Sequence, residues 1–199
     1  MPPILAYLAA SLLYAVLAAY FWRTRWQGSA QKPPTAPWEQ YAIVAPLLIH
    51  AYSLQLTLFG GGVISLGFGN AISAIVFLTV LVYWVASFVY RIEGLQALLT
   101  PVAAVAALLP AAFPALHPLA HTELPAFRFH LLIAMLAYSL FTIAALHALL
   151  MAVAERRLHH ATMPPMVSDL PPLLTMEAVL FRIIWTGFIL LTLTLASGI

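Results

Sequence analysis

Two histidines within long apolar segments are the residues best placed to carry chemistry. His50 lies near the middle of the apolar segment 41–59, and His130 lies near the start of the segment 127–153. Ionisable side chains at membrane depth are rare and are functional candidates by default. Because a neutral imidazole is a common ligand of metals and of haem iron, the pair could bind one metal ion or one haem iron from opposite sides. The alternative is that each histidine packs helices and hydrogen-bonds to a neighbour.

The residues around each histidine extend this hypothesis. Ser53 and Thr57 follow His50 at helical spacing, which predicts a polar helix face. His130 begins a face that continues through Tyr138 and Phe141, which predicts a narrow aromatic groove below the imidazole. At 1.5 Å per residue, His50 should lie about 13 Å and His130 about 5 Å below the outer helix ends. Helix tilt could absorb much of that difference.

The other histidines favour simpler roles. His147 lies about 260° around the helix from His130, so we expect it to pack helices near the cytoplasmic end and not to share that site. His117 and His121 have the spacing of a helical metal site, but Pro118 between them favours a solvated loop. The histidines at 159–160 follow two arginines and predict a basic patch facing lipid headgroups.

The composition requires a membrane environment for these residues. Of 199 residues, 64% are hydrophobic and only 7% are charged, which is too few charges for a water-facing surface. We predict an all-α polytopic bundle with about six transmembrane helices, in a single domain covering 1–199. The predicted spans are 4–22, 41–59, 71–90, 95–113, 127–153 and 178–197.

The positions of the basic residues predict the orientation of these spans. Most lie in loops on one side of an alternating bundle, namely Arg23, Arg25, Lys32, Arg91, Arg156 and Arg157. By the positive-inside rule these loops are cytoplasmic, so both termini should lie outside.

Several classes of function are excluded by what the sequence lacks. The chain has no cysteine, which excludes thiol catalysis and thiolate metal sites. The eight basic residues are too few for a nucleic-acid footprint. No Gly-Lys phosphate-binding motif or paired intramembrane carboxylate is present, which argues against ATPases and hydrolases.

The second half of the chain resembles a known family. The stretch 129–141, FHLLIAMLAYSLF, followed by AALHA at 144–148, is similar to the core of the cytochrome c assembly (CcsA/CcmC/HemX-like) membrane proteins. The motif LPPLLTME at 170–177, with Phe181-Arg182 and GFILLTLT at 187–194, resembles the YpjD branch of proteobacterial inner-membrane proteins. His50 also lies where that branch has a histidine.

The resemblance implies haem handling in a bacterial inner membrane. Relatives carry haem within the bundle on transmembrane histidines, and the matching positions here are His50 and His130. It implies a non-covalent, b-type haem with bis-histidine ligation, and apocytochrome c or another haem-handling membrane protein as partner, besides membrane lipid. The alternative is a transporter or a regulatory or scaffold subunit without bound haem.

Two departures from the family pattern bear on activity. The haem-lyase members carry a Trp-rich outward motif, and neither predicted outward loop here contains a tryptophan, which argues against an enzymatic haem attachment. The YpjD branch continues for about two more spans, whereas this sequence stops at Ile199. We therefore expect either a natural short form or a chain that lacks part of the site.

Overall fold

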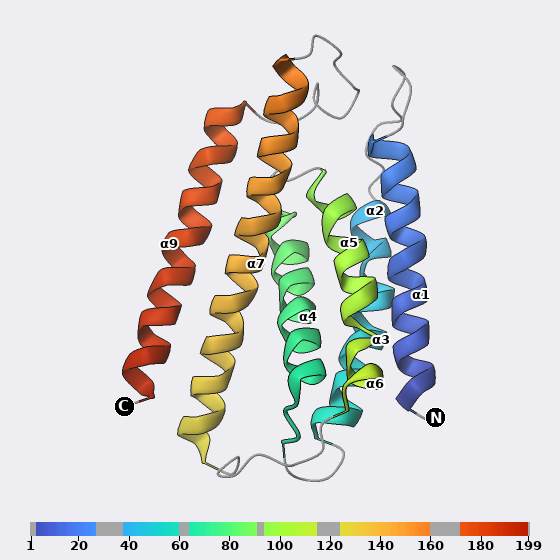
Figure 1. The fold of residues 1–199 in the computed structure, drawn as a ribbon, viewed down its shortest axis with the longest axis vertical. Helices are drawn as coiled ribbons and strands as arrows, with labels where there is room; N and C mark the ends of the chain where they lie inside the picture. The colour runs from blue at the N-terminus through green and yellow to red at the C-terminus, as the bar shows by residue number, and fades with distance from the viewer. Residues whose placement is uncertain are drawn as a thin grey trace.

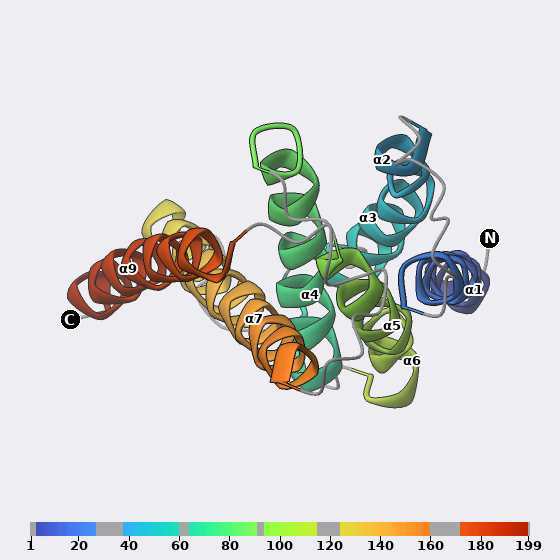
Figure 2. The same ribbon diagram turned by 90° about the horizontal axis from the view of Figure 1, so that it is seen from above.

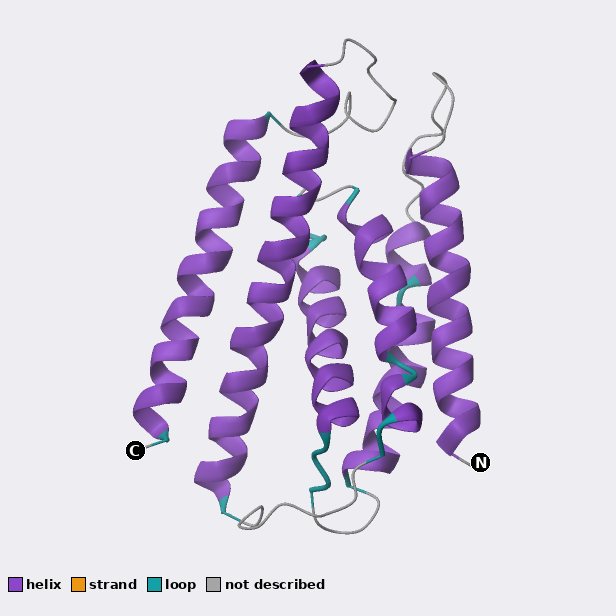
Figure 3. Ribbon diagram, viewed as in Figure 1, coloured by secondary structure: helices purple, strands orange, loops and turns teal. Residues whose placement is uncertain are grey.

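The fold is an all-helical bundle. The computed structural model describes residues 3–26, 38–59, 64–90, 94–114, 124–159 and 172–198, and these contain helices and no strand (Figure 3). The elements are α1 (Pro3–Phe21), a π-helical turn η1 (Trp22–Trp26), α2 (Trp38–Ala42), α3 (Val44–Leu58), α4 (Phe68–Ala86), α5 (Leu95–Ala106), α6 (Leu109–Ala112), α7 (Pro125–His159) and α9 (Leu173–Ser197).

Six helical segments in the described residues are long and apolar enough to cross a membrane, which confirms the predicted class. They are Ile4–Thr24, Trp38–Leu58, Phe68–Ala86, Leu95–Ala112, Pro125–Arg156 and Leu173–Ser197. The helix pairs α2–α3 and α5–α6 each make one of these spans. Both ends of the chain lie on the same side of the bundle (Figure 1), and the positive-inside rule continues to predict that this side is the outer one.

The last two helices are longer than the sequence analysis predicted. Helix α7 begins at Pro125 and α9 directly follows Pro172, at prolines that lie outside the predicted spans 127–153 and 178–197. Proline is well accommodated at a helix start, because the first N–H groups of a helix have no intrahelical partner. By contrast, α4 ends at Ala86, four residues earlier than predicted, and the chain then turns through Tyr90.

Helix α4 is the centre of the bundle. It packs against α3, α5, α6 and α7, while α1 packs on α3 and α5 on one flank. On the other flank, α7 and α9 form a long antiparallel pair (Figure 2). The core lies mainly between α1, α3, α4 and α5, and its fully buried side chains include Tyr14, Val80, Leu95 and Leu99.

Small residues allow close helix approach in that core. Ala10 on α1 and Ala103 on α5 are fully buried, and the hydroxyl of Ser11 donates to the carbonyl oxygen of Ala104 at 2.8 Å. A Cβ at Gly69 on α4 would overlap the carbonyl of Leu109. The start of α4 therefore lies directly on the α6 backbone, as expected for helices that associate through small residues.

Candidate functional site

His50 lies on α3, and its side chain is fully buried. Pro46 precedes it by four residues, and a proline ring clashes with the carbonyl four residues earlier. That carbonyl belongs to Ala42, where α2 ends before the turn at Ile43. The sequence thus predicts the bend, and α3 carries His50 into the core with no exposed surface.

The His50 cluster, defined here as His50, Tyr14, Ser73 and Phe77, joins three helices. The Nε2 atom of His50 lies 2.9 Å from the Ser73 Oγ on α4. The rings of Tyr14 on α1 and Phe77 on α4 meet the imidazole edge-on, at centroid distances of 5.8 Å and 5.6 Å. The imidazole is therefore held in an aromatic, water-excluding environment.

Two polar atoms in this cluster have no hydrogen-bond partner within the described part of the chain. These are the Nδ1 of His50 and the hydroxyl of Tyr14, both fully buried. Leaving such a group unsatisfied costs about 1–3 kcal/mol, so each orphan calls for an explanation. A buried neutral imidazole with one free nitrogen has the donor chemistry that a metal or haem iron requires.

The predicted polar face of α3 does not point to a ligand. The Ser53 hydroxyl donates to the carbonyl oxygen of His50 at 2.7 Å, and the Thr57 hydroxyl donates to that of Ser53 at 3.0 Å. Both groups are therefore satisfied by their own helix, as hydroxyl side chains commonly are within apolar helices.

His130 lies in a different and more open setting. It is half-buried near the start of α7, and its Nδ1 is 2.9 Å from the Ser197 Oγ at the end of α9. The groove predicted below it does not form as expected. Tyr138 is 52% exposed, and the Phe141 ring packs toward Gly187 on α9, where an added Cβ would lie 3.3 Å from it.

The structure gives the two predicted ligands separate partners. Those of His50 come from α1 and α4, whereas the partner of His130 comes from α9. Helix α4 lies between α3 and the α7–α9 pair in both views (Figures 1 and 2).

Of the five remaining histidines, the structure describes the side chain of one, His147. His147 is 2% exposed and its Nε2–H donates to the Met176 carbonyl oxygen at 3.0 Å, so it packs α7 on α9 and does not share the His130 site. His117, His121 and His160 lie outside the described residues, and so does the side chain of His159, the last residue of α7. Elsewhere in the described chain, no three histidine, aspartate or glutamate side chains gather to hold a metal ion.

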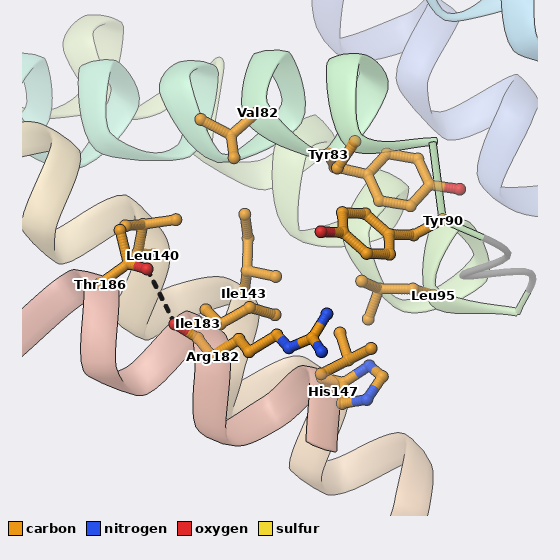
Figure 4. Close-up of a pocket in the computed structure, with 12 residues that line it drawn as sticks. Val82, Tyr83, Tyr90, Leu95, Leu140, Ile143, His147, Arg182, Ile183 and Thr186 are labelled. Atoms are coloured by element: carbon orange, nitrogen blue, oxygen red, sulfur yellow. Dashed lines mark hydrogen bonds between the residues drawn. The ribbon is translucent and has the colours of Figure 1, made fainter. Parts of the chain in front are cut away.

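Sequence reasoning missed two participants. The first is Tyr14, whose ring covers His50, and only the tertiary structure brings the two together. The sequence analysis also assigned no role to Arg182, which lines a cavity beside His147 (Figure 4). The signal was present, because Arg182 is the only charged residue in the predicted span 178–197.

Fold and site together define a multi-pass membrane protein with a buried histidine among aromatic rings. Residues 38–199 match the family of cytochrome c assembly proteins, and the chain belongs to that family. No curated protein and no solved structure matches the chain. Family membership indicates a role in cytochrome c biogenesis, and the family is associated with haem handling.

Proposed function

We propose that this chain binds haem non-covalently in the bacterial inner membrane and hands it on during cytochrome c assembly, with His50 and His130 as axial ligands. The single observation that carries the proposal is the orphaned Nδ1 of His50, buried among aromatic rings in a chain of this family. An unsatisfied buried nitrogen is costly in the free protein, and coordination would remove that cost.

The two histidines would contribute differently. His50 is fixed by Ser73 and by two rings, so it would orient its imidazole without rearranging its side chain. His130 is half-buried where α7 begins and α9 ends, and it contacts one hydroxyl there, that of Ser197. Because α4 lies between these regions, binding of one iron by both histidines requires the α7–α9 pair to shift relative to α3.

When bound, haem would supply a redox-active iron whose potential is set by its axial ligands and by burial. The chain's own residues would hold the haem through the two imidazoles and exclude water from it. They would later release the haem. We propose delivery to apocytochrome c or to another haem-handling membrane protein, without a covalent step catalysed by this chain.

The test is an absorption spectrum of the detergent-purified protein, oxidised and then reduced, before and after hemin addition. We expect sharp Soret and α bands in the wild type and their loss in His50→Ala and in His130→Ala. His147→Ala is the matched control, because it removes another buried histidine, and it should retain the bands.

Two other outcomes would change the proposal. Loss of the Soret and α bands in His50→Ala alone would mean that the protein provides one haem ligand, His50. A wild-type spectrum that stays free of haem bands after hemin addition would refute the ligand assignment and favour a transporter or a scaffold subunit.

A further inference from the structure

A second site lies between α4, α7 and α9, away from the His50 cluster. It is a cavity of about 220 Å³ whose walls are mostly apolar, contributed by residues such as Val82, Ile143 and Ile183. Its lining also includes the guanidinium of Arg182, the imidazole of His147 and three hydroxyl-bearing side chains, those of Tyr83, Tyr90 and Thr186. In Figure 4 the Arg182 side chain extends from α9 into the space between Tyr90 and His147.

The Arg182 guanidinium has no partner among the residues that the structure describes. Its main-chain carbonyl oxygen accepts a hydrogen bond from the Thr186 hydroxyl at 2.8 Å, and its side chain is exposed on the surface of the helices. A cation beside apolar helix faces is expensive unless an anion compensates it. The cavity therefore presents a positive charge that calls for an anionic ligand.

His147 adds an independent indication of a ligand. Its Nε2–H donates to the Met176 carbonyl oxygen, which leaves Nδ1 as a hydrogen-bond acceptor in the neutral ring. This Nδ1 is buried and has no partner in the described chain. A ligand that carries a hydroxyl next to its anionic group would satisfy both His147 and Arg182.

The level of the cavity in the bundle points to a lipid. Its α4 lining comes from the last turn of that helix and from Tyr90, just beyond the end of the span at Ala86. Figure 1 shows α7 and α9 extending beyond this level. Arg182 lies nine residues after the start of the span Leu173–Ser197, and a long arginine side chain within a span can extend toward the phospholipid phosphates. Basic pockets between membrane helices bind anionic head groups.

We propose that this cavity binds an anionic phospholipid with a hydroxylated head group, of the phosphatidylglycerol type. The phosphate would pair with Arg182, a head-group hydroxyl would donate to His147 Nδ1, and an acyl chain would lie against the apolar walls. The cavity lining includes neither His130 nor any residue of the His50 cluster. The inference therefore stands apart from the proposed haem site.

The experiment is native mass spectrometry of the full chain in a neutral detergent, titrated separately with phosphatidylglycerol, phosphatidylcholine and inorganic phosphate. We expect phosphatidylglycerol to bind preferentially, and R182Q to weaken that binding about tenfold, as loss of a charge-assisted hydrogen bond would. R182K should retain part of it. The matched control R156Q removes an exposed arginine near the end of α7 and should leave it unchanged.

Three results would overturn the proposal. Equal binding of phosphatidylcholine would show a non-specific lipid surface, and equal binding of inorganic phosphate would show an anion site without a lipid.

The sequence also places Glu93 between the lining residues Tyr90 and Leu95, in residues outside the described part. If Glu93 is the counter-ion of Arg182, E93Q and R182Q would lower thermal stability alike and phosphatidylglycerol would show no preference. The haem spectrum of R182Q should match the wild type, so this proposal and the haem proposal can fail separately.

Discussion

His50 and His130 are both histidines within long helices, yet they differ in burial and in hydrogen bonding. His50 is sealed between α1, α3 and α4 with one nitrogen unsatisfied, whereas His130 is half-buried at the ends of α7 and α9 with a hydroxyl partner. The difference follows from position in the bundle, since α3 packs against both α1 and α4, whereas the α7–α9 pair has an outer face. The comparison teaches that the first half of the chain builds most of the buried interior, whereas the last two helices form a flank with an exposed outer face.

The largest effect should come from removing an aromatic wall of the His50 cluster. Tyr14→Ala should lower the free energy of unfolding by about 3–5 kcal/mol, because it empties the volume of a fully buried ring. Tyr138→Ala on α7 is the matched change at a 52% exposed tyrosine and should cost less than about 1 kcal/mol. Denaturation in mixed micelles measures both, and equal losses would contradict the division into interior and flank.

A second pair of substitutions compares backbone contacts in the two regions. Gly69→Ala forces a Cβ against the rigid carbonyl of Leu109 and should destabilise the protein by about 1–3 kcal/mol. Gly187→Ala meets only the Phe141 ring, at 3.3 Å, and that side chain can move aside, so the loss should be under about 1 kcal/mol. The reverse order of thermal unfolding temperatures would show that the α7–α9 contact is the tighter one.

A third comparison removes the hydroxyl partner of each histidine. Ser73→Ala leaves a second nitrogen of His50 buried without a partner and should cost about 1–2 kcal/mol. Ser197→Ala leaves His130 half-buried, where water can replace the hydroxyl, and should change stability by less than about 0.5 kcal/mol. Unfolding of the haem-free protein is the appropriate measurement, and a larger loss in Ser197→Ala would show that His130 is the more tightly enclosed residue.

The smallest effect concerns the orphaned hydroxyl of Tyr14. Tyr14→Phe removes a buried group without a partner and keeps the ring, so stability should rise slightly, by up to about 1 kcal/mol. A loss above that size in the same denaturation assay would mean that the hydroxyl has a partner, such as bound water or a cofactor.

Much of the fold could be predicted from the sequence because membrane helices follow simple rules. Long apolar segments must be helical in lipid, so the all-helical class and six helices long and apolar enough to cross a membrane are confirmed within the described residues. The last two helices begin earlier than the predicted spans 127–153 and 178–197, at Pro125 and directly after Pro172. Arg182 could have been found from its charge within a span, but its cavity could not.

The sequence by itself determined that this protein is all-helical, with six helices long and apolar enough to cross a membrane, because hydropathy and helix length depend on local residues alone. Only the tertiary structure decided that Tyr14 and Ser73 enclose His50, that His130 instead contacts Ser197, and that Arg182 shares a cavity with His147. The physical reason is that hydropathy specifies which segments enter the bilayer, while packing between helices far apart in the chain specifies which of their faces meet.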